Sequence, residues 1–169
     1  MIPAPAFFRE LFEYVRWCDH ECMLAARSVA DAEYYRDQQM SHGSLHKQLT
    51  HMMAAEWLWL NRWRGSQTAK IETVDDHPTR MVVEQRWPLV HAAMLDFVAH
   101  QTSATLARNI TYKNSRGDLV TLPLASLMLH VVDHAAYHRG QVNTMIRRAG
   151  GQLRSISFLA YSLQKEKHW

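Results

Sequence analysis

The sequence contains few of the residues that interrupt regular structure, with six Gly and five Pro among 169 residues. Hydrophobic residues make up 47% of the chain. This composition excludes a disordered chain and a fibrous repeat. Because a chain of this length can bury one sizeable core, we expect a single domain over residues 1–169.

Cysteine is also scarce. The two cysteines, Cys18 and Cys22, lie four residues apart in a predicted helix. This spacing suits a metal-binding or redox pair, but it is more typical of two small buried side chains in a reducing cytosol. We therefore expect buried thiols and a cytoplasmic protein.

A long uninterrupted hydrophobic run is missing as well. The most apolar stretch, residues 119–132, is interrupted by Thr121, Pro123, Ser126 and His130. This pattern indicates that no membrane span is present. The first eight residues lack a basic segment followed by a long apolar stretch and a cleavage site, so we expect no secretion signal.

No block of one charge sign is present, since 19 Lys+Arg face 16 Asp+Glu and the net charge is +3. Arg147, Arg148 and Arg154 cluster after the last long predicted helix. Basic residues at such a position are typical of a solvated helix end that complements the helix dipole. Nucleic-acid binding is therefore not favoured.

Four long segments have hydrophobic residues three and four positions apart, which is typical of amphipathic helices. They cover about residues 4–30, 44–65, 79–101 and 123–149. Residues 109–121 have β-forming residues on both sides of a turn and predict a small hairpin. A short helix at about residues 157–165 follows. Four long helices in one domain predict an all-α fold, a four-helix bundle.

Capping residues refine the helix ends. Ser44 is a good N-cap for the second long helix, and Gly150 and Gly151 are expected to stop the fourth. Pro88 lies inside the third helix and predicts a kink or a broken start there.

Histidine, in contrast, is abundant, with 11 residues. His130, His134 and His138 follow one another at four-residue intervals in the fourth long helix. Residues four apart on a helix are only about 40° apart around its axis, so two such imidazoles can bind one cation. His134 and His138 are expected to face the bundle interior, whereas His130 lies farther round and misses the site.

The spacing alone is weak evidence, because paired core or surface histidines have the same pattern. A third ligand must come from another helix, and His51, which flanks the apolar face of the second long helix, can reach the same interior. The other seven histidines are expected to be solvated or partly buried: His20, His42, His46, His77, His91, His100 and His168.

Two acidic residues lie on apolar helix faces, Asp19 on the first helix and Glu56 on the second. Ionised carboxylates are rarely buried without a partner. Together with Asp133, they are candidates to accept the second N–H of a metal-binding imidazole. The alternative for Glu56 is a salt bridge, for instance to Arg62 or Arg139.

Several motifs resemble those of the DinB/YfiT-like family. Residues 134–142, HAAYHRGQV, resemble its H-x-x-x-H-R-G-Q signature, which is the most specific of these motifs. Residues 14–19 are similar to the first-helix pattern Y-x-x-W-A-N, and residues 51–62 to H-x-x-x-x-E-x-x-W-x-x-R. The hairpin leading into the last long helix also agrees, through Tyr112, Asn114, Gly117 and residues 122–124. The resemblance covers about residues 7–163.

This resemblance implies an up-down-down-up bundle, a homodimer, and one divalent cation, zinc or nickel, held by three histidines. Carried over by position, the ligands are His51, His134 and His138. Two positions depart from the family pattern. Asp19 replaces an Asn and adds negative charge near the site, and Ser157 replaces an Asp before the last helix, where Ser can also cap.

Three imidazoles leave coordination positions open, as in catalytic zinc sites. Since the family is similar in fold to thiol-dependent transferases and isomerases, the leading hypothesis is a metal-dependent enzyme that activates a low-molecular-weight thiol, such as bacillithiol or mycothiol. Asp19, Glu56 or Tyr137 would assist proton transfer. Activation of water for hydrolysis uses the same parts. The alternative is a non-enzymatic, stress-related metal-binding dimer.

Overall fold

The structure, a computed structural model, describes residues 4–66 and 70–167. The first three residues of the N-terminal segment and His168 lie outside these ranges. Four long helices form the body of the molecule: α1 (Pro5–Ala26), α3 (Leu45–Trp63), α4 (Arg80–Ala99) and α6 (Leu124–Arg148). Helix α1 packs against α4 and α6, and helix α3 packs against the same two helices.

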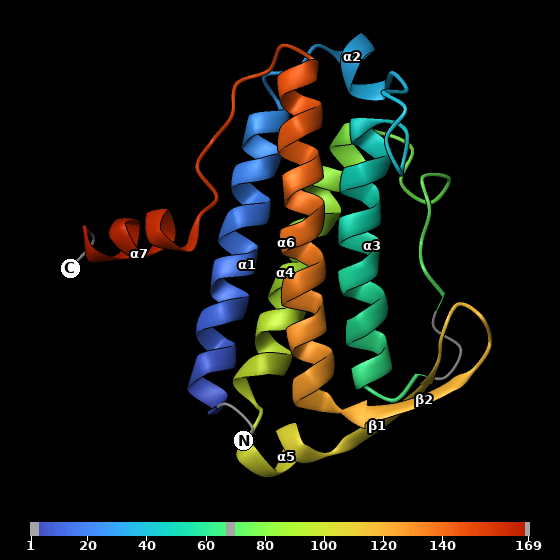
Figure 1. The fold of residues 1–169 in the computed structure, drawn as a ribbon, viewed down its shortest axis with the longest axis vertical. Helices are drawn as coiled ribbons and strands as arrows, with labels where there is room; N and C mark the ends of the chain where they lie inside the picture. Colours follow the sequence, from blue (N-terminus) through green and yellow to red (C-terminus); the bar gives the residue numbers. More distant parts are fainter. Residues whose placement is uncertain (1–3, 67–69, 168–169) are drawn as a thin grey trace.

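The helix directions confirm the predicted bundle. Figure 1 shows α1 running upwards from the end marked N, α3 and α4 running downwards, and α6 running upwards. Since α3 and α4 point the same way, the chain must return between them, and residues 70–79 lead back to the start of α4 along the outside of α3. The order is therefore up-down-down-up.

The capping residues act as expected. Ser44 Oγ accepts a hydrogen bond from the backbone N–H of Lys47 at the start of α3, and Gly150 follows α6 with a positive φ of 75°. The broken start considered at Pro88 does not occur, because α4 continues through this residue from its cap at Thr79.

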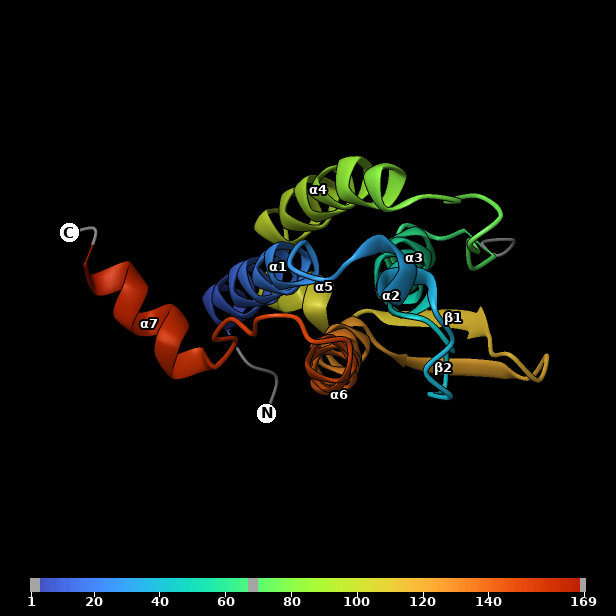
Figure 2. The ribbon, with the colours of Figure 1, turned by 90° about the horizontal axis from the view of Figure 1, so that it is seen from above.

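Shorter elements close the two ends of the bundle. The helices α2 (Asp31–Tyr35) and α5 (Ser103–Ala107) were not expected from the sequence. The predicted hairpin is present as β1 (Asn109–Lys113) and β2 (Leu119–Pro123), antiparallel, with Thr111 opposite Thr121. Strand β1 contacts α3 and β2 contacts α6, so the hairpin extends beside these two helices (Figure 2).

The last helix, α7 (Phe158–Glu166), projects away from the bundle and contacts α1 (Figures 1 and 2). Its N-cap is Ser157, whose Oγ accepts a hydrogen bond from the N–H of Ala160. Trp17 of α1 donates its indole N–H to Gln164 of α7, at 2.8 Å. The serine therefore caps this helix, as expected.

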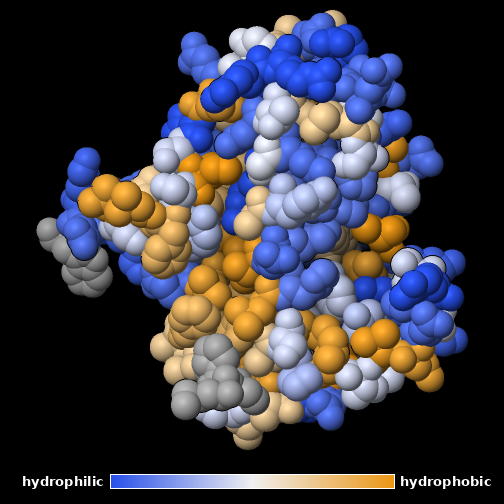
Figure 3. All heavy atoms as spheres, viewed as in Figure 1, coloured by the Kyte–Doolittle hydropathy of each residue, from blue (hydrophilic) through white to orange (hydrophobic). Residues whose placement is uncertain are grey.

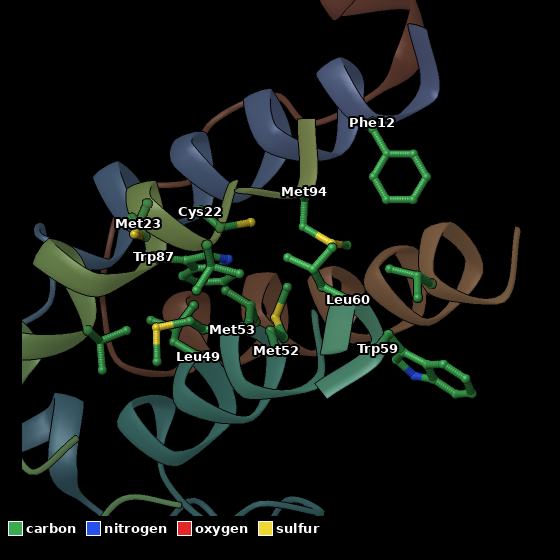
Figure 4. Close-up of a cluster of buried hydrophobic side chains, with 14 of the residues drawn as sticks. Phe12, Cys22, Met23, Leu49, Met52, Met53, Trp59, Leu60, Trp87 and Met94 are labelled. Carbon is green, nitrogen blue, oxygen red and sulfur yellow. The ribbon is translucent and has the colours of Figure 1, made fainter. Parts of the chain in front are cut away.

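The core lies between the four long helices, and Figure 4 shows part of it, including Met53 and Trp87. Burying each large apolar side chain contributes about 1.5–3 kcal/mol. Cys18 and Cys22 are buried and free of a disulfide, which confirms the expected small core side chains. Within the described ranges, no helix is both long and apolar enough to cross a membrane.

Candidate metal centre

Three histidine side chains converge between α3 and α6. His51 Nε2 lies 3.4 Å from His134 Nε2, and His134 Nε2 lies 3.0 Å from His138 Nε2. His134 and His138 are one turn apart on α6, so their rings project from the same side, and His51 faces them from α3. The fold thus brings together the three candidate ligands named from the sequence.

The donor atoms fit a divalent cation. Nitrogen ligands about 2.0–2.1 Å from a shared zinc, at a tetrahedral angle, lie about 3.3 Å apart. The two Nε2 separations, 3.0 and 3.4 Å, are close to this value. Imidazole nitrogen suits transition metals such as zinc, copper, iron and nickel rather than magnesium or calcium.

A glutamine orients one of these rings. His138 Nδ1 lies 2.7 Å from Gln141 Oε1, which accepts its N–H. The proton on Nδ1 leaves the Nε2 lone pair free for a cation. Gln48, from α3, has its amide nitrogen 2.8 Å from the same Nδ1. Because an amide nitrogen is also a donor, this contact is a hydrogen bond only in the other tautomer, whereas the Nδ1-protonated form that suits metal binding uses Gln141. Gln141 is part of the family signature, but no role was predicted for it, although a residue three positions after His138 lies on the same helix face.

A fourth histidine reaches the site from the turn before α3. The ring of His42 stacks on that of His51, with centroids 3.9 Å apart and planes 22° apart. Donor atoms of His42, His51 and His138 all lie within 4.8 Å of one another. Gly43 has a φ of 75°, a conformation that glycine adopts without strain, and this turn places His42 over the site. From the sequence, no role was expected for His42 there.

The surroundings keep these imidazoles neutral. Burial, helped by the charges of neighbouring histidines, lowers the pKa of His51 to about 3 and that of His134 to about 4. Burial also lowers the pKa of His138. The three rings are therefore unprotonated at pH 7, which is the form in which imidazole binds metal ions.

The three histidines lie beside a pocket of about 960 Å³. His51 and His134 form part of its wall, and Trp59, Tyr112 and His130 form another part. The volume is typical of small-molecule sites. A cation held by the histidines would thus have room for a substrate next to it.

A second polar cluster lies within the core. His91 of α4 places Nε2 3.4 Å from Asp19 Oδ2 of α1 and 3.4 Å from Glu56 Oε2 of α3. All three residues are at most 5% exposed. Trp87 donates its indole N–H to Glu56 at 2.9 Å, and Arg139 of α6 donates to Asp19 at 3.4 Å. One ionic cluster therefore joins all four long helices.

Charges within this cluster set its protonation. Burial alone would lower the pKa of His91, but the adjoining carboxylates outweigh burial and raise it to about 9. Burial raises the pKa of Glu56 to about 7, and the charge of Asp19 adds to this shift. For Asp19, burial is outweighed by His91 and Arg139, which lower its pKa. At neutral pH, His91 is therefore a cation between two carboxyl groups.

The chain matches a known protein family over almost its whole length. A model described as the DinB family matches residues 4–167. The chain belongs to the DinB family. Among curated proteins, it is 22% identical over 149 residues to protein DinB of Bacillus subtilis (strain 168), a match that covers 85% of this chain and 87% of that protein.

Solved structures show the same fold as this DinB-family chain. A DinB-like protein from Bacillus cereus ATCC 10987 superposes with a TM-score of 0.71 at 16% identity, over 93% of this chain and 100% of that one. YfiT from Bacillus subtilis superposes with a TM-score of 0.64 at 12% identity, over 86% and 89% of the two chains. YfiT is a probable metal-dependent hydrolase with an unusual four-helix bundle topology.

The other candidate residues of this DinB-family site lie around it in different ways. Asp133 is exposed, and its charge acts on His134. Tyr137 is 66% exposed, with its ring centroid 5.1 Å from that of His138. His130 lies in the pocket wall, with its ring 5.0 Å from that of Trp59.

Two expectations about polar residues are corrected. His46, His77 and His91 are buried rather than solvated or partly buried, because each has polar or aromatic neighbours within the fold. The alternative for Glu56, a salt bridge, is present, but its partner is His91 rather than Arg62 or Arg139. Glu56 contacts Trp87 and His91, while Arg139 pairs with Asp19.

Proposed function

We propose that the protein is a divalent-metal-dependent enzyme in which His51, His134 and His138 hold zinc or nickel. A bound cation of this kind would lower the pKa of water or of a low-molecular-weight thiol and so supply a nucleophile at neutral pH. The residues of the chain hold the ion and bind the electrophilic substrate beside it. The reaction is then a hydrolysis or a thiol transfer.

One observation carries this proposal: three imidazole nitrogens converge within 3.0–3.4 Å of their neighbours beside a pocket of about 960 Å³. Catalytic zinc sites have three protein ligands and an open position, whereas structural sites are closed by a fourth. The probable metal-dependent hydrolase YfiT, which shares this fold, supports the hydrolytic form of the reaction. Of the three candidates for assisting proton transfer, Tyr137 lies next to His138, whereas Asp19 and Glu56 belong to the buried cluster around His91.

The position of His42 favours the second candidate function, a non-enzymatic, stress-related metal-binding protein. Its ring stacks on His51 and its donor atoms lie near those of His51 and His138. A cation bound also by His42 would have a closed coordination sphere and a purely structural role. In the structural role His42 therefore binds the cation, whereas in the enzyme it does not.

Replacing His42 by alanine separates them. If the protein is an enzyme with an open position, H42A keeps one equivalent of metal per chain, measured by elemental analysis after dialysis. Metal-depleted wild-type protein regains turnover when one equivalent of zinc or nickel is added. The assays use ester and phosphoester substrates, and thiol transfer from bacillithiol, mycothiol and glutathione to model electrophiles.

The opposite pattern supports the structural role. H42A would then lose its metal, as expected when one of four ligands is removed, and no metal-dependent turnover would appear with any of these substrates. His20→Ala, which removes an exposed histidine of α1, is the matched control and leaves metal content unchanged in either case.

We further propose that the protein is a homodimer in the cytoplasm. Helix α7 stands apart from the bundle and exposes Phe158, Leu159 and Leu163, which are 46%, 68% and 51% exposed. Figure 3 shows hydrophobic surface on this projecting segment. Apolar side chains grouped in this way are typical of surfaces that bind another protein. The reduced, buried thiols of Cys18 and Cys22 suit the cytoplasm.

Sedimentation equilibrium tests the dimer. Wild-type protein at micromolar concentration is expected to have twice the chain mass, and the double variant Leu159→Glu/Leu163→Glu is expected to have the mass of one chain, because two buried charges would oppose association. Leu119→Glu, an exposed leucine of β2, is the control that keeps the dimer. A monomeric wild type, or a double variant that remains dimeric, would contradict the proposal.

A further inference from the structure

The pocket beside the three histidines has basic residues in its wall that metal binding does not explain. Arg62, Lys70 and Lys113 contribute to its wall. Among the described residues that line the pocket there is no Asp or Glu. A concave site with cationic side chains and no acidic ones attracts anions.

Arg62 is held in place by its neighbours. Its guanidinium carbon lies 4.8 Å from the ring centroid of Trp59 and 4.7 Å from that of Tyr112. Its Nη2 donates to the backbone carbonyl of Lys113, at 3.1 Å. Aromatic rings and one hydrogen bond thus fix the orientation of the group. A guanidinium has five N–H donors, and this hydrogen bond uses only one of them.

The charge of Arg62 is partly buried without a counter-ion. In the ranges that the structure describes, Arg62 forms no salt bridge, whereas Arg139 and Arg27 each pair with a carboxylate. Burial lowers the pKa of Arg62, because a partly buried cation loses part of its hydration. Removing a cation from water costs free energy unless an anion compensates for it. A ligand can supply that anion.

The rest of the wall is apolar. Ala55, Leu58 and Ile71 line the pocket together with the rings of Trp59 and Tyr112. Ligand sites of this kind enclose a hydrophobic body and use a few charged groups to orient it. His51 and Arg62 are three turns apart on α3, about 16 Å along the helix axis. An extended ligand therefore fits the pocket better than a compact one.

We propose that this pocket binds an elongated organic anion, with its carboxylate or phosphate at Arg62 and its apolar body directed towards His51 and His134. Lys70 and Lys113, which also line the pocket, add to its positive charge. The inference deepens the proposed function, because the anion would be the substrate of the metal centre. Arg62 would then be a substrate-binding residue that positions the reacting part of the molecule beside the three histidines.

Calorimetric titration of metal-depleted protein tests this directly. The probes are 4-phenylbutyrate, its neutral counterpart 4-phenylbutanamide, and phenyl phosphate. The carboxylate is expected to bind at least about tenfold more tightly than the amide, as a charge-assisted hydrogen bond allows. Comparing the carboxylate with the phosphate identifies which anion the site prefers.

Variants assign the effect to one side chain. Arg62→Met keeps a linear apolar chain between the two rings and is expected to lose the tenfold preference for the anion, whereas Arg62→Lys retains part of it. The matched control is Arg64→Met, which removes an exposed arginine two residues away and leaves binding unchanged. Unchanged circular dichroism and zinc content in Arg62→Met show that the variant is folded.

Three results would overturn the proposal: equal affinity of the wild type for carboxylate and amide, no binding of either anion, or full anion affinity in Arg62→Met. Because the titration uses protein without metal, anion binding can be present even when no metal-dependent turnover is found. Failure of the proposed function and failure of this inference are therefore distinguishable.

Discussion

Replacing both His134 and His138 by alanine is expected to reduce bound zinc or nickel from one equivalent per chain to near zero. The two Nε2 atoms lie 3.0 Å apart, and His51 alone would remain of the three converging ligands. Removing a residue that only orients a ligand typically costs 10–100-fold in metal affinity. Removing two ligands must cost far more, so the ion should be lost on dialysis.

Gln141 gives the same site a graded test. Its Oε1 accepts the N–H of His138 Nδ1 at 2.7 Å, so Gln141→Ala removes the group that orients the ring and leaves all three ligands in place. We expect a loss of about 10–100-fold in zinc affinity, measured by competition with a chromophoric chelator. His130→Ala, one turn from His134 on α6, is the control that keeps wild-type affinity.

The outcome that contradicts the ligand assignment concerns the double variant described first. Full metal content after replacement of both His134 and His138 by alanine would disprove that these histidines bind the metal.

Helical periodicity explains why most of the fold was predictable. The apolar spacing that predicted the third long helix, about residues 79–101, corresponds to α4 (Arg80–Ala99). Periodicity needs several turns to become visible. The five-residue helices α2 and α5 are too short for it, and the first helix ends at Ala26 rather than near residue 30 because the chain turns into α2.

Helical periodicity also explains which site residues could be predicted from the sequence. His134 and His138 share a helix face with four-residue spacing, so their direction follows from the sequence. His42 lies in a turn before α3, where no periodicity fixes the direction of a side chain. Its place over His51 follows from the path of residues 36–44, which only the folded chain shows.

His91 was missed for another reason. Polar residues are assigned to the outer face by default, yet His91 follows the buried Trp87 by four residues and precedes the buried Met94 by three. Its position therefore matched the inner stripe of α4, and that spacing was the available signal. A histidine is stable there because Asp19 and Glu56, themselves on apolar helix faces, stand opposite to it.

This cluster is expected to dominate the effects of single substitutions on stability. Arg139 is 2% exposed and Asp19 is fully buried, with Arg139 Nη1 donating to Asp19 at 3.4 Å. Arg139→Met leaves the carboxylate of Asp19 in the core with His91 as its remaining cationic neighbour. Breaking a buried ion pair from one side costs about 3–5 kcal/mol of unfolding free energy, because the other charge stays buried and uncompensated.

Urea unfolding in the presence of a chelator measures this loss without a contribution from metal binding. Arg147→Met, an exposed arginine two turns along α6, should change the unfolding free energy by less than about 0.5 kcal/mol. Combining Arg139→Met with Asp19→Asn removes both charges, so the double variant should be less destabilised than the sum of the single ones. If the unfolding free energy of Arg139→Met is within about 1 kcal/mol of the wild-type value, the pair does not stabilise the bundle. If the losses of unfolding free energy in the two single variants add up exactly in the double variant, the loss in Arg139→Met comes from lost packing around Arg139 and not from the uncompensated charge.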